Sequence, residues 1–108
     1  MNKQHYIAAL LIWIDNHIEE PLPLDAISAK SGYSKRYLQA LFKRETDITL
    51  GDYVRKRRLE MAARELRGGA TPILDLAIKY NFNCQQSFTR AFKREYQITP
   101  GHFRRIGE

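Results

Sequence analysis

The sequence predicts an all-α protein of about seven helices, arranged as two similar helical units that are joined by a long central helix. Three observations support this prediction. A segment near the middle of the chain reappears at its end, apolar residues recur at the period of an α-helix, and residues that start and stop helices lie between the periodic segments. With 108 residues, the chain has the length of one small domain.

The internal repeat has an offset of 50 residues. The run FKRETDITLGDYVRKR, which begins at Phe42, returns as FKREYQITPGHFRRI from Phe92. Upstream, LDAISAKSGYS and LDLAIKYNFN share an apolar and turn pattern at an offset of 49, so one extra residue enters the second copy near its turn. Each half is therefore expected to be one supersecondary unit that is used twice.

The first copy begins with two predicted helices. Residues 4–19 place their apolar side chains on one stripe, and Pro21 and Pro23 follow, which cannot continue a helix. Asp25 or its neighbour begins a short helix that ends at Ser31–Gly32, where a glycine suits the left-handed turn after a helix.

A second helix completes a helix-turn-helix shape in each copy. Ser34 is expected to cap a helix that extends to about Thr46, so that helix, glycine turn and helix follow within about twenty residues. In the second copy, Thr71 is the predicted cap and Pro72 the first helical residue. Asn81 takes the place of the glycine, because asparagine is the residue next best suited to positive φ.

Three helices remain. Residues 84–96 are predicted to form the second helix of the second helix-turn-helix, and residues 99–100 to begin a short last helix. Between the two copies, Thr49 caps a helix over residues 50–67 that the glycines 68–69 stop. This central helix would be about 27 Å long at 1.5 Å per residue.

The central helix has two apolar faces, which implies that it packs against two bodies. The first face consists of Leu50, Tyr53, Val54 and Met61. The second face lies nearly opposite on the helix and consists of Leu59, Ala62, Ala63 and Leu66. We therefore interpret it as a rigid bridge. The predicted organisation is a first subdomain over 1–49, a linker helix over 50–68 and a second subdomain over 69–108.

The charge of the chain is unevenly distributed. The total is +6, but residues 1–34 contain two lysines and four acidic residues and so have −2, which leaves +8 for residues 35–108. A basic body of this kind favours a polyanionic partner, although a solvated basic surface is the alternative.

The cysteine count and the hydropathy of the chain exclude several classes of protein. Cys84 is the only cysteine, which excludes an internal disulfide and favours a reducing compartment; we interpret it as a small, inert residue. The three histidines lack metal-ligand spacing, so no metal is expected. The apolar run 7–14 is too short to cross a membrane, and the predicted location is the cytoplasm.

Two helix faces are predicted to read DNA bases. In the helix after Ser34, Leu38 and Phe42 mark the buried side. The exposed side follows the i, i+3, i+4, i+7 spacing: Arg36, Gln39, Ala40 and Lys43. The offset of 50 gives the matching face and its neighbours: Gln85, Gln86, Ser87, Thr89, Arg90 and Lys93. Arginine can bind guanine and glutamine can bind adenine. A solvated helix face would also be polar, but its repetition favours DNA.

Basic residues around these faces are candidates for phosphate contacts, which position a protein without reading sequence. They are Lys35, Lys43, Arg44, Arg55, Lys56, Lys93, Arg94, Arg104 and Arg105. Arg44 and Arg94 could equally pair with nearby glutamates. Thr49 and Thr99 begin helices whose backbone N–H groups can bind anions, and capping alone also explains these two threonines.

Two segments resemble the DNA-binding domain of the AraC/XylS family of bacterial transcription regulators: SGYSKRYLQALFKRETDITLGDYVRKRRL and ILDLAIKYNFNCQQSFTRAFKREYQITPGHFR. The resemblance extends from Leu11 to Arg105, and it is strongest to the single-domain, stand-alone activators of this family. It implies one such domain over 1–108 and a monomer that places two helices in successive major grooves of an asymmetric site on double-stranded DNA. It also implies a nucleoid-associated activator that recruits RNA polymerase to stress, multidrug-efflux or redox-defence promoters.

Carried over by position, the base-reading residues of the family fall on eight positions. These are Arg36, Gln39, Ala40, Gln85, Gln86, Ser87, Thr89 and Arg90. Many members have Trp at the position of Arg36 and Arg at that of Ala40, so the first half-site preference is expected to differ. The segment QQSFTR of the second unit matches the family pattern.

Other functions explain less of the sequence. Repression is the nearest alternative, because a sequence does not tell where a site lies relative to the polymerase. A protein-interaction module would explain the helices but not two matched basic faces. An enzyme is not expected, since no nucleophile has an adjacent base and no glycine loop could cradle a phosphate. The sequence therefore predicts no catalytic residue and no cofactor.

Overall fold

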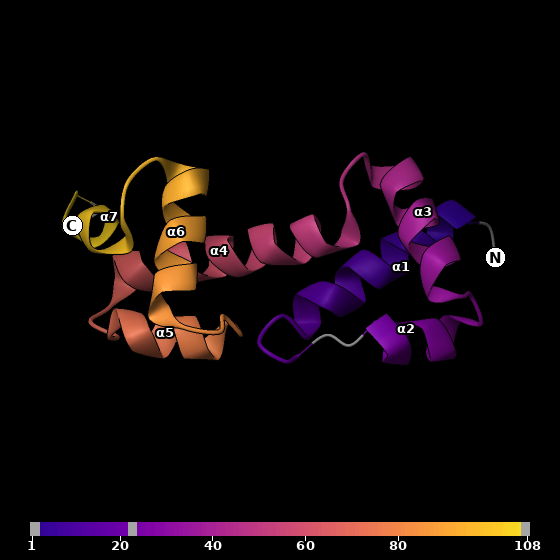
Figure 1. Cartoon of the computed structure of the whole chain (residues 1–108), viewed down its shortest axis with the longest axis horizontal. Coiled ribbons are helices and arrows are strands. Elements are labelled where there is room, and N and C mark those ends of the chain that lie inside the picture. The colour runs from indigo at the N-terminus through magenta and orange to yellow at the C-terminus, as the bar shows by residue number, and fades with distance from the viewer. Residues whose placement is uncertain (1–2, 22–23, 107–108) are drawn as a thin grey trace. The chain divides into compact units, whose positions relative to one another are not determined.

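The computed structural model describes residues 3–21 and 24–106, and these residues form seven α-helices and no strand (Figure 1). The all-α prediction is therefore confirmed. In chain order, the helices are α1 (Lys3–Asn16), α2 (Leu24–Ser31), α3 (Lys35–Thr46), α4 (Leu50–Gly68), α5 (Ile73–Lys79), α6 (Gln85–Tyr96) and α7 (Pro100–Ile106).

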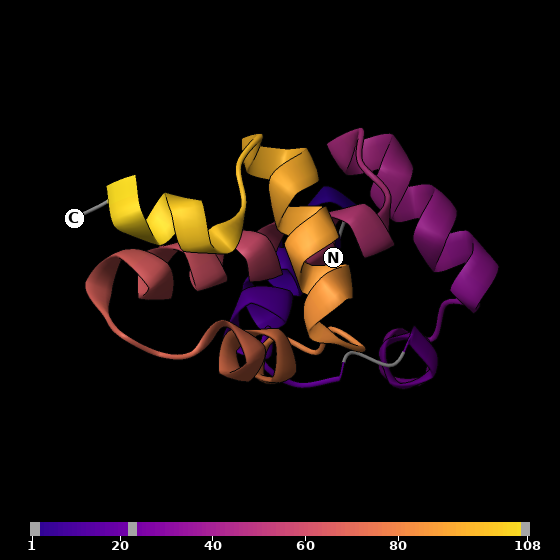
Figure 2. The ribbon, with the colours of Figure 1, turned by 60° about the vertical axis from the view of Figure 1, so that its left-hand side comes forward.

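The chain divides into two compact units, with the boundary between Arg55 and Lys56. The first unit consists of α1, α2, α3 and the start of α4. The second consists of the rest of α4 with α5, α6 and α7, and in Figures 1 and 2 these three helices surround the second half of α4. The long helix α4 thus contributes residues to both units.

In the first unit, apolar residues of four helices form the core. Leu38 and Phe42 of α3 are fully buried, as the helical period predicts. Tyr53 of α4 packs edge-on against Phe42 at 5.7 Å between ring centroids, and its hydroxyl donates to Asp15 Oδ1 of α1 at 3.1 Å. The start of α4 is therefore attached to both α1 and α3.

In the second unit, the core is aromatic. Phe92 of α6 is fully buried and contacts three other aromatic rings, of Phe88, Tyr96 and Phe103, at 4.6 to 5.8 Å between centroids. The predicted second face of α4 closes this core, and all its members are buried: Leu59, Ala62, Ala63 and Leu66. The contact of Phe92 with Phe103 attaches α6 to α7.

The first helix ends three residues earlier than the sequence predicts. In a continuing helix the N–H of His17 would donate to the Trp13 carbonyl. Instead, this N–H donates to Ile14 O at 3.0 Å, and the His17 ring Nδ1 donates to Trp13 O at 2.7 Å. The histidine side chain thus takes the acceptor that the next helical turn needs, and α1 stops at Asn16.

The start of α5 was also predicted one residue too early. Pro72 is the residue before the helix, with an extended ψ of 144°, and no side chain caps α5. The carbonyl of Thr71 accepts a hydrogen bond from the guanidinium of Arg104 in α7. Thr71 is therefore held by a distant residue, and the helix begins at Ile73.

Candidate nucleic-acid interface

The turn between α2 and α3 is fixed by local hydrogen bonds. Gly32 has a φ of 81°, as predicted for the left-handed turn. Ser31 Oγ donates to Ser28 O at 3.0 Å and accepts from Tyr33 N at 3.1 Å. Ser34 Oγ then accepts from Tyr37 N at 3.1 Å, which confirms Ser34 as the cap of α3. These bonds set the direction in which α3 leaves the turn.

The first reading face consists of Arg36, Gln39, Ala40 and Lys43, and all four residues are exposed on α3. Within the described residues, the side chains of Arg36 and Gln39 have no hydrogen-bond or ion-pair partner. Lys43 Nζ donates to Asp47 O at 2.9 Å, at the end of the helix. The structure therefore brings these four residues to one surface and leaves two polar side chains available to a ligand.

The second reading face lies on α6 and consists of Gln85, Gln86, Ser87, Thr89, Arg90 and Lys93. Ser87 and Thr89 are half-buried and the other four are exposed. In the described part of the chain, the side chains of Gln86 and Arg90 bind no acceptor or carboxylate. The two units thus present equivalent polar faces on equivalent helices.

Both reading helices end in the same way. Asp47 after α3 has a φ of 63°, and Gln97 after α6 has a φ of 70°. Their N–H groups donate to Lys43 O and Lys93 O, respectively. These two left-handed residues were not predicted, although their equivalent positions in the repeat are the signal that could have identified them.

Cys84 has a structural role that the sequence did not indicate. It is the residue before α6, and its Sγ accepts from Ser87 N at 3.4 Å and lies 3.3 Å from Ser87 Oγ. The hydrogen bonds with Ser87, with a smaller effect of the Arg90 charge, lower the pKa of the exposed Cys84 thiol below its usual range. The thiol therefore caps the second recognition helix.

Replacement of Ser87 by alanine is expected to raise the pKa of the Cys84 thiol toward that of an ordinary cysteine. The hydroxyl is the largest cause of the lowered pKa, because its hydrogen bond favours the thiolate. The alkylation rate of the only cysteine, measured against pH, gives this pKa directly. Thr89→Ala, on the same helix, serves as the control; equal pKa values in Ser87→Ala and the unchanged protein would refute the assignment.

The residues predicted to contact phosphates differ in whether they already form an ion pair within the protein. Four are exposed and have no ion-pair partner among the residues that the structure describes: Lys56, Lys93, Arg94 and Arg105. Three form ion pairs with Asp25, Glu45 and Asp52, respectively: Lys35, Arg44 and Arg55. The pairs of Lys35 and Arg55 are exposed on both sides and contribute little stability, so a phosphate can replace the carboxylate. Glu45, the partner of Arg44, is half-buried.

Arg104 differs from these residues because its guanidinium binds backbone carbonyls. Nε donates to Leu66 O at 3.4 Å and Nη2 donates to Thr71 O. The side chain is half-buried and connects α7 to the end of α4. These bonds compete with the predicted phosphate contact, and we assign Arg104 to positioning the second unit.

Thr49 and Thr99 cap the helices that follow them. Thr49 Oγ1 accepts from Asp52 N at 3.1 Å, and Thr99 Oγ1 accepts from His102 N at 3.2 Å. Capping therefore accounts for both threonines, which remain exposed beside the ends of α3 and α6.

Three residues that the sequence did not single out attach α5 and the residue after it to α4. The Glu65 carboxylate accepts from Tyr80 Oη and from Lys79 Nζ, the latter at 3.0 Å. Burial raises the pKa of Glu65, but the bonds from Tyr80 and Lys79 outweigh it and the net pKa is lowered. The supporting helix of the second unit is thus held by a carboxylate that stays ionised.

Residues 3–21 and 24–106 show no sign of two other classes of site. They contain no group of three or more His, Cys, Asp or Glu residues that could hold a metal ion. A helix long and apolar enough to cross a membrane is likewise absent from them.

Known proteins resemble this chain over most of its length. A model of the helix-turn-helix domain family matches residues 27–106. Regulatory protein SoxS of Escherichia coli K12 is 48% identical over 104 residues, which cover 96% of this chain and 97% of SoxS. Transcriptional regulator Rob of Salmonella typhimurium is 48% identical over all 108 residues, and the chain spans 37% of the length of Rob.

The fold is shared with a solved structure. A transcriptional regulator with an AraC-type DNA-binding domain, from Chromobacterium violaceum, superimposes with a TM-score of 0.82 at 27% identity. The match covers 97% of this chain and 91% of that protein. The matched range 27–106 of the helix-turn-helix model contains both α3 and α6, and Rob and the Chromobacterium violaceum protein are named as transcriptional regulators.

Proposed function

This chain belongs to the AraC/XylS family of helix-turn-helix transcription regulators, and from that premise we propose that it binds an asymmetric DNA site as a monomer. It places α3 and α6 in two successive major grooves and recruits RNA polymerase. Its targets are promoters of stress, multidrug-efflux or redox-defence genes, and it acts in the cytoplasm at the nucleoid.

The two equivalent reading faces are the observation that carries this proposal. Arginine can bind both acceptors of guanine, and glutamine can bind adenine through its amide. Arg36 and Gln39 in the first unit, like Gln86 and Arg90 in the second, project from the surface without a protein partner in the described residues. A chain with two recognition helices needs no second copy, because each helix can read one half-site.

The basic surface supplies the sequence-independent part of binding. Residues 35–108 have a net charge of +8 and contain both reading faces. Lys56, Lys93, Arg94 and Arg105 contact phosphates and fix the register of the two helices. Arg104 contributes indirectly, because it attaches α7 to α4 within the second unit.

Activation of stress-defence genes is proposed from the likeness to SoxS, of which this chain matches nearly the full length. Polymerase recruitment would place a surface outside α3 and α6 against the enzyme. Transcription in vitro from a promoter that contains the selected site tests this part: we expect more transcript with the protein than without it, and less transcript would indicate repression.

Replacement of single arginines tests the reading faces. Arg90→Ala is expected to cost about 1 to 3 kcal/mol of binding free energy and to relax preference at a few adjacent base pairs in one half of the site. Arg36→Ala should relax the other half. Ala40→Arg should add preference for guanine in that same half, because alanine offers only a methyl group.

The measurement is a binding-site selection on each variant at one salt concentration, with circular dichroism to confirm folding. Arg94→Ala is the matched control on α6, since a phosphate contact should weaken all sequences alike. If Arg36→Ala and Arg90→Ala also weakened all sequences alike, both arginines would contact phosphates and the assignment of the reading faces would be wrong.

A further inference from the structure

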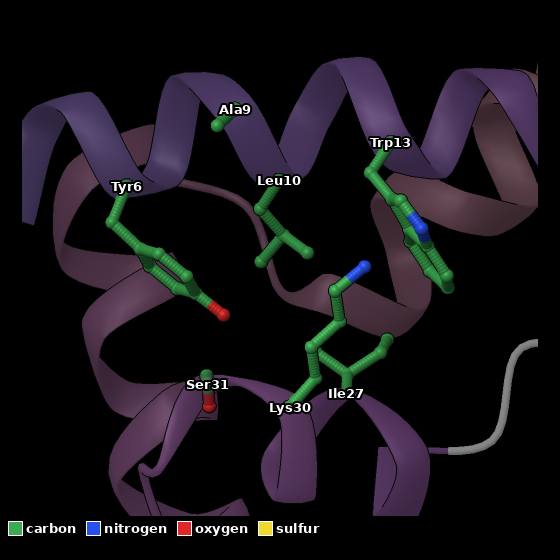
Figure 3. Close-up of a pocket in the computed structure, with 7 residues that line it drawn as sticks. All are labelled: Tyr6, Ala9, Leu10, Trp13, Ile27, Lys30 and Ser31. Atoms are coloured by element: carbon green, nitrogen blue, oxygen red, sulfur yellow. The ribbon is translucent and has the colours of Figure 1, made fainter.

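A hollow of about 350 Å³ lies between α1 and α2 of the first unit (Figure 3). Its apolar walls come from Leu10 and Trp13 of α1 and from Ile27 of α2, and Tyr6 and Ala9 complete the α1 side. This volume is at the small end of the range of ligand pockets, about 300 to 1,000 Å³. The function proposed above does not use this surface.

The walls are held in place without a ligand. Tyr6 packs edge-on against Tyr33 at 5.4 Å between ring centroids, and Trp13 stacks on His17 at 4.3 Å. Leu10 is 6% exposed and belongs to the core of the unit. A preformed pocket of this kind binds a ligand without the cost of ordering its own side chains.

One cation and two uncharged donors lie at the hollow. Lys30 Nζ is 5.7 Å from the centroid of the Trp13 ring, and in Figure 3 it extends from α2 toward α1 between Leu10 and Trp13. Among the described residues, Lys30 has no carboxylate partner, and the Tyr6 hydroxyl and Trp13 N–H have no acceptor. An apolar hollow with one unpaired ammonium is complementary to an apolar molecule with one negative charge.

We propose that this hollow binds a small monocarboxylic acid with an apolar body. The carboxylate accepts a charge-assisted hydrogen bond from Lys30 Nζ, and the body lies between Tyr6, Leu10 and Trp13. A phosphate ester fits less well, because it has about two negative charges and three acceptor oxygens for a single lysine. The site is separate from the reading face of α3, which does not contribute to its lining.

Trp13 lines the hollow and is the only tryptophan of the chain, so the tryptophan fluorescence of the protein comes from this site. The probe is 3-phenylpropanoate, and 3-phenylpropanamide is the uncharged match of the same shape. We expect a saturable change with the carboxylate at a Kd of about 0.1 to 1 mM, as for a ligand of few atoms, and binding of the amide about tenfold weaker.

Three variants of the full chain locate the site. Lys30→Gln should raise the Kd of the carboxylate about tenfold, to the value of the amide. Lys3→Gln is the matched control, because Lys3 lies over the ring of Tyr37 at 5.4 Å and outside the hollow, and its Kd should be unchanged. Ala9→Phe fills the hollow from an exposed position and should abolish binding while circular dichroism stays the same.

Two results would overturn the proposal. One is a fluorescence of Trp13 that does not saturate with the carboxylate up to about ten times the expected Kd. The other is equal binding of carboxylate and amide with no effect of Lys30→Gln. If Ala9→Phe and Lys30→Gln instead reduced polymerase-dependent transcription and left probe binding unchanged, this face would bind a protein and the ligand assignment would be wrong.

Discussion

One alanine inserted after Lys56 is expected to lower the affinity for a specific site by about a hundredfold to a thousandfold. An extra residue in a continuous helix turns everything after it by about 100° and moves it by 1.5 Å. If both reading faces bind one DNA molecule, only one of them can then bind correctly. The loss approaches half of the free-energy difference between specific and non-specific binding, which typically corresponds to 10³ to 10⁷ in affinity.

The position of the insertion keeps each unit intact. The insertion lies one residue beyond the boundary between Arg55 and Lys56, so the contact of Tyr53 with Phe42 belongs entirely to the first unit and is not disturbed. The bond of Glu65 with Tyr80 belongs entirely to the second unit. The inserted chain should therefore fold, as thermal melting can show.

Lys56→Ala is the control for the insertion, because it changes the same place without changing the helical phase. It should lose only one phosphate contact. An inserted chain that melts normally and binds the specific site with unchanged affinity would mean that the two units do not bind together.

Binding is also expected to depend steeply on salt, by roughly five-hundredfold between 50 and 200 mM. If about five phosphates are neutralised, the slope of log affinity against log salt is about −4 to −5, because each contact releases counterions from the DNA. The residues proposed for these contacts are exposed and belong to residues 35–108, which have a net charge of +8. Titrations at several salt concentrations with one specific DNA give the slope.

Two variants show where these contacts lie. Lys93→Ala should reduce the size of the slope by about one. Lys30→Gln should leave the slope unchanged, since Lys30 lies against Trp13 of α1. A slope near zero with retained specificity would contradict the electrostatic part of the proposal.

Features that depend on neighbouring residues could be predicted from the sequence. Ser34, Thr49 and Thr99 accept the backbone hydrogen bonds expected of capping residues. Gly32 and Asn81 both have positive φ in the two turns. These features follow from local chemistry, because a cap or a left-handed residue acts within three or four positions of the chain.

Features that depend on distant residues could not be predicted. The carbonyl of Thr71, which precedes α5, accepts a hydrogen bond from Arg104, 33 residues away in the sequence. At the early end of α1, the His17 ring binds the carbonyl of Trp13, and the periodicity of apolar residues does not predict this hydrogen bond. Exposure of the reading faces follows from the period, but the free donors on Arg36 and Arg90 become evident only when every nearby carboxylate has been located.

The central claim is that one chain reads two half-sites at once, and the most direct measurement compares three DNA duplexes. One contains a site obtained by selection with the full chain, and each of the other two has one half of that site scrambled. We expect two half-sites about 10 base pairs apart, and a loss of affinity of at least tenfold when either half is scrambled. If scrambling one half had no effect on affinity, the chain would read DNA through a single unit and the account would be contradicted.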